Sequence, residues 1–101
     1  MLQRATILYP NGGFEVRQKP GRFELEELCE MVGGYIAQVP GLTSFNGQPC
    51  STWCDEEGLQ KQLPVNLDAT TWWEMTGTRG NDFLVGNVVF IQSIAELRHA
   101  D

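Results

Sequence analysis

The sequence predicts a single α+β domain, in which one amphipathic helix packs on a mixed, mostly antiparallel β-sheet and short helices lie at the periphery. Two β-prone runs joined by Asn-Gly-Gly predict an N-terminal hairpin, and a helical period replaces the strand pattern after residue 21. A nearly continuous apolar run at residues 82–94 predicts a strand buried on both faces. Since 101 residues is the length of one ordinary domain, we assign residues 1–101 to a single unit.

The N-terminal hairpin is predicted from residues 4–10, RATILYP, and residues 14–19, FEVRQK. Both runs contain β-branched and aromatic residues, which favour strands. Asn11-Gly12 lies between them, and this dipeptide accepts the positive φ angles of a tight hairpin turn. We therefore expect the chain to reverse at Asn11-Gly12.

The helix is predicted within residues 21–39, GRFELEELCEMVGGYIAQV, by apolar residues at i, i+3, i+4 and i+7. This stripe consists of Leu25, Leu28, Cys29 and Val32. Glutamates fill the first turns, where their negative charges interact favourably with the positive end of the helix dipole. Gly33-Gly34 predicts the end of the helix. The pattern makes Cys29 a small core residue, and a reactive thiol is the alternative.

Shorter strands are predicted after the helix. Residues 35–39, YIAQV, alternate in polarity and end at a Pro-Gly turn signal, which is typical of a strand. Residues 42–45 and 49–54 flank Asn46-Gly47, so we expect a second hairpin there.

The C-terminal part contains the strongest strand. The run at residues 82–94 is expected at the centre of the sheet, with Gly86 as a bulge. Ser93 precedes Glu96 by three residues, which is the spacing of a capping box. This spacing predicts a short terminal helix at residues 93–100.

Composition and charge exclude several classes of function. The chain has 13 acidic and 7 basic residues and a net charge of −6, so it lacks the clustered cations that a nucleic-acid backbone requires. We therefore expect no direct nucleic-acid binding. No apolar run approaches the roughly 18 residues that span a bilayer, and the N-terminus has no signal-peptide core. We expect a cytoplasmic protein with no membrane partner.

The cysteines predict neither a disulfide framework nor a metal site. Cys29, Cys50 and Cys54 form an odd set in a chain without a secretion signal, so we expect them to be reduced. A structural zinc site needs four ligands, and the only histidine, His99, lies near the C-terminus. We expect no metal and no cofactor.

Residues 54–66, CDEEGLQKQLPVN, concentrate a thiol, three acids and an amide. In a structural interpretation, Asp55 caps a helix and Glu56 and Glu57 favour its dipole. In a functional interpretation, Glu56 or Glu57 is a general base or metal ligand, although no partner histidine or nucleophile lies nearby in the sequence. Gly58 costs about 1 kcal/mol within a helix. It therefore indicates a non-helical turn with positive φ or a close backbone approach, with the acids in a loop beside the sheet.

Several motifs together resemble a known family. VGGYIAQV, CDEEGLQKQLPVN, an alanine three residues after Asn66, and DFLVGNVVF occur here in this order. The combination resembles domain of unknown function 3846, a family of small proteins found in bacteriophage, plasmid and other mobile-element genomes. The resemblance covers most of the chain, departs from the family pattern between Val39 and Cys50 and in the Trp-rich stretch, and implies a genomic setting more than a mechanism. It is sharpest at Gly33, Gly34, Tyr35, Cys54, Asp55, Glu56, Glu57, Gly58 and Asn66.

Aromatic residues provide the other candidates for binding. Trp72 and Trp73 are adjacent, so they cannot both face the core from one helix or strand. We expect one to be buried with its N–H satisfied and the other to lie at an interface, where Tyr35 and Trp53 could join it in an aromatic pocket. The candidate ligand- or partner-binding residues are Tyr35, Trp53, Asp55, Glu56, Glu57, Asn66, Trp72 and Trp73, and no catalytic residue is predicted.

These observations favour a non-enzymatic binding protein of phage or mobile-element origin. It would sequester or inhibit a host or defence component, either a protein or a small molecule, and we expect it to form a homo-oligomer. One alternative is an acidic DNA mimic that inhibits a DNA-binding protein, with acids at residues 24–30 and 55–57. A second alternative is a small metal-dependent hydrolase that uses Asp55, Glu56 and Glu57.

Overall fold

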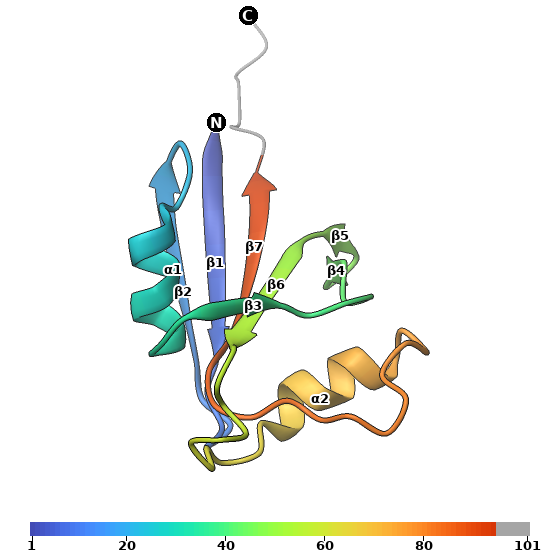
Figure 1. Ribbon diagram of the computed structural model, residues 1–101. Helices are drawn as coiled ribbons and strands as arrows, with labels where there is room; N and C mark the ends of the chain where they lie inside the picture. Colours follow the sequence, from blue (N-terminus) through green and yellow to red (C-terminus); the bar gives the residue numbers. More distant parts are fainter. Residues whose placement is uncertain (95–101) are drawn as a thin grey trace, which may run out of the picture.

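The computed structural model describes residues 1–94 and confirms the α+β class (Figure 1). Its elements are β1 (Leu2–Leu8), β2 (Phe14–Pro20), α1 (Leu25–Val32), β3 (Ile36–Gln38), β4 (Ser44–Phe45), β5 (Gln48–Pro49), β6 (Ser51–Asp55), α2 (Leu67–Glu74) and β7 (Val88–Ile94). Neither helix of the described chain is long and apolar enough to cross a membrane.

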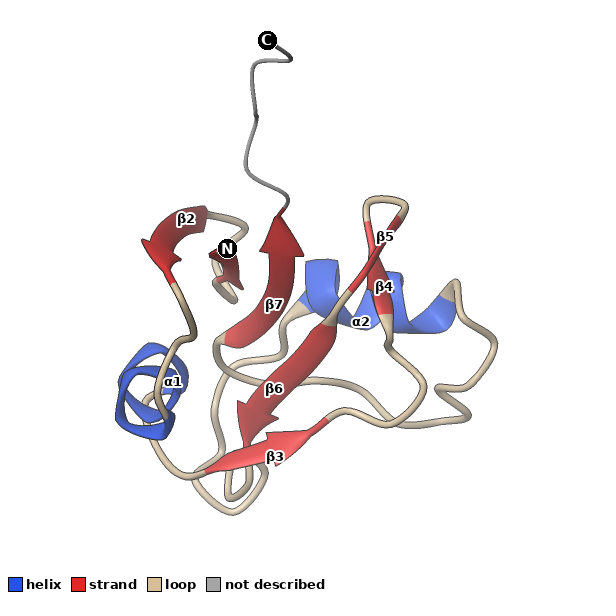
Figure 2. Cartoon of the chain, turned by 90° about the horizontal axis from the view of Figure 1, so that it is seen from above, coloured by secondary structure: helices blue, strands red, loops and turns tan. Residues whose placement is uncertain are grey.

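Five strands form the main sheet in the order β2-β1-β7-β6-β3, and β4 and β5 form a separate two-stranded sheet. Every strand pairing within residues 1–94 is antiparallel. The strand β7 lies in the middle of the main sheet, as its nearly continuous apolar sequence predicts. The helices cover opposite faces of this sheet, with α1 on one side and α2 on the other (Figure 2).

Both predicted hairpins form, but the first turn differs from its prediction. The N–H of Gly12 donates to the carbonyl of Tyr9 at 3.1 Å, so Pro10 and Asn11 occupy the corner and only Gly12 has a positive φ, of 90°. Pro10 explains the shift, because its fixed φ suits the first corner position of a type I turn. The second hairpin reverses at Asn46-Gly47 as predicted, with φ angles of 53° and 81°.

The helix α1 has both predicted ends, but its buried side is shifted. Glu24 and Glu27 form a capping box at its start, and Gly33 ends it in the left-handed region. Its buried residues are Met31 and Val32, whereas Leu25 is 63% exposed. The expectation that Leu25 faces the core is therefore wrong, because the C-terminal half of α1 makes the helix's contact with the sheet.

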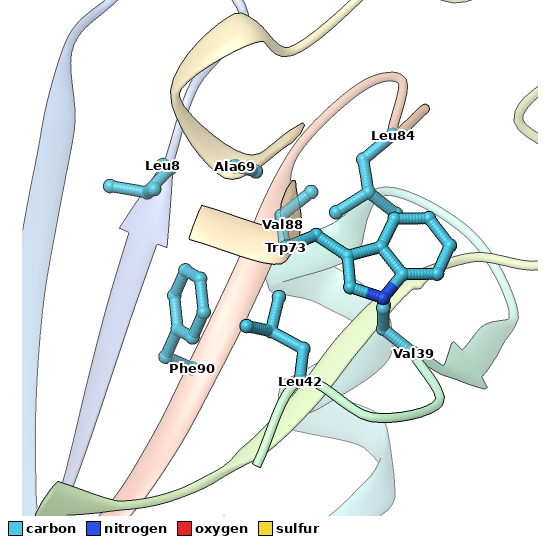
Figure 3. Close-up of a cluster of buried hydrophobic side chains, with 8 residues drawn as sticks. All are labelled: Leu8, Val39, Leu42, Ala69, Trp73, Leu84, Val88 and Phe90. Carbon is cyan, nitrogen blue, oxygen red and sulfur yellow. The ribbon is translucent and has the colours of Figure 1, made fainter. Parts of the chain in front are cut away.

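Alternate residues of β7 enter two hydrophobic clusters on opposite faces of the sheet. The α2-side cluster contains Val88 and Phe90, together with Trp73 of α2 and Leu42 (Figure 3). The α1-side cluster contains Val89 and Ile91 of β7, together with residues of β1 and α1. The sheet is therefore buried on both faces along β7.

The C-terminal predictions are corrected in part. The strand β7 begins at Val88, and Gly86 lies before it rather than forming a bulge within it. Val85 pairs with Val65 in an isolated bridge. Ser93 and Ile94 complete β7, so the predicted terminal helix does not begin at Ser93. The remainder of that predicted helix lies outside the described residues.

We expect the capping box to make stability depend on acidic pH. The backbone N–H of Glu24 and the ammonium of Lys19 lower the pKa of Glu27 from its usual 4.5. A carboxyl group whose pKa is lower in the folded state than in the unfolded state stabilises the fold fully at pH values above its unfolded-state pKa. This stabilisation is lost as the pH falls through the folded-state pKa.

Denaturant unfolding at a series of pH values from neutral to about pH 3 measures this dependence. Glu27→Gln should flatten the decline of the unfolding free energy below the ordinary glutamate pKa. Glu26→Gln is the matched control, because the Glu26 side chain is exposed and makes no hydrogen bond or ion pair within residues 1–94. Parallel pH profiles for Glu27→Gln and the unmodified protein would contradict this role of Glu27.

Candidate functional site

The segment after β6 is a series of turns rather than the helix of the structural interpretation. Asp55, whose side chain is only 1% exposed, accepts hydrogen bonds from the N–H of Glu57 at 2.8 Å and from Nζ of Lys61 at 2.7 Å. The ion pair with Asp55 raises the pKa of Lys61. Glu56 and Glu57 are exposed. Asp55 therefore organises its own turn, while the two glutamates point to solvent.

Two glycines of the family-like motifs allow this turn to pack closely. A Cβ on Gly34 would lie 2.7 Å from Oδ2 of Asp55, and a Cβ on Gly58 would lie 2.7 Å from Cγ2 of Val85. Gly58 does not have a positive φ, so close approach rather than backbone conformation explains it.

Asn66 connects three parts of the chain. It is fully buried, and its Nδ2 donates to the carbonyls of Leu8 at 2.9 Å and Gly86 at 2.8 Å. Its Oδ1 accepts from the N–H of Ala69 at 3.1 Å, which makes Asn66 the N-cap of α2. All of these bonds are internal, so the spacing of Asn66 and Ala69 reflects a structural connection.

The candidate aromatic residues do not form one pocket. Trp73 is 6% exposed and donates from Nε1 to the carbonyl of Pro40, and the half-buried Trp72 packs on the same cluster. Trp53 packs on the α1-side cluster, across the sheet from the tryptophans of α2. Tyr35 is 71% exposed and lines a shallow hollow between α1 and the turn, together with Glu57. The expected joint aromatic pocket is therefore not formed.

The titratable side chains of residues 1–94 do not assemble a metal or thiolate site. No group of three His, Cys, Asp or Glu side chains in this part of the chain is placed to hold one ion. Burial raises the pKa of Cys50, and burial together with the Asp55 carboxylate raises the pKa of Cys54. Both thiols are therefore disfavoured as thiolate nucleophiles at neutral pH.

A groove of about 510 Å³ lies on the α2-side face of the sheet. Strands β1 and β2 supply one part of its lining, and the β4–β5 hairpin and β7 supply the other. We call it the β1–β2 groove, and it is lined by Arg4, Thr6, Leu8, Phe14, Val16, Gln18, Phe45, Asn46, Gln48 and Gln92. None of the eight residues predicted from the sequence lines it.

Arg4 is the only charged residue in this lining. Its guanidinium makes no hydrogen bond or ion pair with any residue from 1 to 94, in a protein whose net charge is −6. Gln92 is 4% exposed and holds the hairpin wall in place, because its Nε2 donates to the carbonyl of Phe45 at 2.9 Å. The groove therefore combines a hairpin fixed by the Gln92 bond, apolar side chains and the guanidinium of Arg4, which has no partner within residues 1–94.

Nearly the whole chain matches one protein family. The family model described as Domain of unknown function (DUF3846) matches residues 4–98. The chain belongs to this family. No curated protein and no solved structure shows significant similarity to it. The DUF3846 match includes both the turn at Asp55 and every residue that lines the β1–β2 groove.

The sequence holds a signal for the groove that the motif analysis missed. Strand β2 reads FEVRQKP, so Phe14, Val16 and Gln18 lie on one face and the charged residues between them lie on the other. This face of β2 is neutral and partly apolar, and Arg4 of β1 lies opposite Gln18. The pattern marks a surface with few charges, on which an apolar ligand can pack. In this DUF3846 protein the turn motifs maintain the fold, and the groove lies elsewhere.

Proposed function

We propose that this chain is a non-enzymatic binding protein that sequesters a host or defence component through the β1–β2 groove. Arg4, which has no hydrogen-bond or ion-pair partner among residues 1–94, lies in an otherwise neutral lining, and this observation carries the proposal. A guanidinium pairs well with a carboxylate or phosphate, and pairing is stronger where surrounding apolar groups exclude water. The bound group, from a small molecule or a protein, is therefore anionic with an apolar portion beside it.

The size and composition of the groove support this proposal. Ligand sites commonly occupy about 300–1,000 Å³ and combine apolar side chains with a few polar groups that fix orientation. Phe14, Val16 and Phe45 supply apolar contact here, and Gln18 and Gln48 supply amides. Because most of this lining comes from strands, the groove is a preorganised surface rather than a loop that must first be ordered.

The first test uses anilinonaphthalene sulfonate and a panel of aromatic carboxylates as probes. We expect changes in the amide NMR resonances of β1, β2 and the β4–β5 hairpin, and we expect Arg4→Gln to weaken probe binding by about tenfold or more. Arg22→Gln is the control, because Arg22 is exposed and lies outside the groove. Equal binding by both variants, or changes spread over the whole surface, would refute the proposal.

Native mass spectrometry of the protein purified from its natural host would identify a bound component. A retained molecule or protein should carry an anionic group and should be lost in Arg4→Gln. A retained component that is unaffected by Arg4→Gln would assign binding to another surface.

A DNA mimic is the second candidate, and one observation favours it. Glu26, Glu30 and Glu57 line the same hollow between α1 and the turn. However, Oε1 of Glu30 lies 3.8 Å from Nη1 of Arg17, and the neighbouring Glu27 pairs with Lys19, which reduces the negative field of this surface. A mimic must lose its target when competing DNA or salt is added, so a complex that resists both would exclude mimicry.

A further inference from the structure

The outer edge of β2 is a strand edge that no other strand of residues 1–94 pairs with, and the charged residues of β2, Glu15, Arg17 and Lys19, all lie on the face opposite the groove. The strand covers seven residues and ends the sheet order, so only β1 pairs with it in residues 1–94 (Figure 2). Its groove face carries Phe14 and Val16, which are 69% and 47% exposed. Such edges are templates for pairing with another strand, and proteins usually protect them with charges, bulges or covering elements.

The bonds between β1 and β2 determine which backbone groups face this edge. Tyr9 donates to the carbonyl of Gly13 at 2.9 Å, and Gly21 donates to the carbonyl of Met1 at 2.8 Å. Hydrogen-bonded pairs recur at every second position of an antiparallel register, so the odd-numbered residues of β2 bond to β1. The even-numbered residues with an N–H therefore present both backbone groups at the outer edge: Phe14, Val16 and Gln18.

The side chains of β2 are self-complementary in one antiparallel register. A two-fold axis through Val16 places Val16 opposite the second copy's Val16 and Phe14 opposite the second copy's Gln18, and each pair exchanges hydrogen bonds in both directions. On the other face, Glu15 lies opposite the second copy's Arg17, which is a favourable cross-strand pair.

The two neighbouring registers are less favourable. A two-fold axis through Arg17 would place two arginines directly opposite each other, which destabilises a strand pair. It would also bring Pro20 into the ladder, where Pro20 has no N–H to donate. The other neighbouring register, with a two-fold axis through Glu15, would place two glutamates opposite each other, so charge disfavours both neighbouring registers and selects the one centred on Val16.

We propose that two copies of this chain associate through β2 and form one continuous antiparallel sheet with a two-fold axis at Val16. The second copy's Phe14 then lies beside Gln18 at the open side of the β1–β2 groove, and the two grooves join into one trough. Only this effect on the groove rests on the proposed function, since the strand geometry carries the dimer by itself.

Sedimentation velocity over a concentration series tests the dimer. The unmodified protein should form dimers that dissociate in the micromolar range, since a pair of strands buries a small interface. Val16→Lys places two ammonium groups at the axis and should raise the dissociation constant by at least about tenfold, with an unchanged circular dichroism spectrum. Leu67→Lys is the control, because Leu67 is 72% exposed on α2.

Either of two results would overturn the dimer. One is an unmodified protein that stays monomeric at every concentration, and the other is a Val16→Lys variant that dimerises as well as the unmodified protein. Arg4→Gln separates this proposal from the proposed function, because Arg4 lies on β1 and not at the edge. Unchanged probe binding by a dimeric Arg4→Gln variant would refute the groove and leave the dimer intact.

A charge exchange tests the register. Arg17→Glu and Glu15→Arg should each weaken the homodimer, because each places like charges opposite each other. A mixture of the two variants should form a heterodimer, since every cross-strand pair is then of opposite charge. The absence of association in the mixture, with both variants folded, would refute the register centred on Val16.

Discussion

Replacing Trp73 with alanine is expected to lower the free energy of unfolding by about 3–5 kcal/mol. Trp73 is 6% exposed within the α2-side cluster (Figure 3). Its Nε1 donates to the carbonyl of Pro40 at 2.9 Å. Truncation leaves a cavity between α2 and the sheet and removes this bond. A domain of this size has a total stability of only about 5–15 kcal/mol. The melting temperature, followed by circular dichroism, should therefore fall by more than about 10 °C.

The adjacent residue provides the matched control for this experiment. Trp72 is only half-buried, and its ring lies 4.7 Å from that of Phe45 in a tilted arrangement. Trp72→Ala should cost about 1–2 kcal/mol, because much of the ring already contacts water. Equal losses for the two variants would contradict the assignment of Trp73 to the core.

Replacing Asn66 with alanine is expected to destabilise the fold by about 3 kcal/mol or more. The change removes the bonds that Nδ2 donates to the buried carbonyls of Leu8 and Gly86, and each lost bond costs about 1 kcal/mol. The N-cap of α2 is lost as well, at about 1 kcal/mol. Urea denaturation, fitted with a common slope, measures the total.

Two further variants identify the source of the Asn66 effect. Asn66→Asp keeps an acceptor for the N–H of Ala69 but removes both bonds that Nδ2 donates. Its free energy of unfolding should therefore fall by most of the amount expected for Asn66→Ala. Asn81→Ala is the control, because Asn81 is exposed, and its effect should stay within about 0.5 kcal/mol. A small effect of Asn66→Ala would show that Asn66 is dispensable to the fold and available for binding.

The hairpins, the helix α1 and the strand β7 were predictable because their signals are local, whereas the sequence pattern predicted no helix at residues 67–74, where α2 lies. Asn46-Gly47 specifies a two-residue turn with two positive φ angles, and the structure has this turn. The capping box of Glu24 and Glu27 and the left-handed Gly33 follow in the same way from short-range backbone chemistry. The first hairpin turn was misplaced because Pro10, which fixes its own φ, had more influence than Asn11-Gly12.

The candidate site was not predictable from the same signals. Asp55 and Asn66 stand out in the sequence, yet their polar atoms bond to the chain itself. The groove depends on residues that are distant in sequence, with Arg4 from β1 and Phe45 from β4. No spacing rule connects such residues, because the pairing of β1 with β7 and the bond from Gln92 to the hairpin bring them together.

The sequence by itself determined the α+β class, the two hairpins, the helix α1 and the central position of β7, because turn chemistry and apolar periodicity act over a few residues. Only the tertiary structure decided which tryptophan is buried, why Gly58 is a glycine and where Arg4, the charged residue of the groove lining, lies. These features depend on contacts between distant segments, which form only when both faces of the sheet are covered.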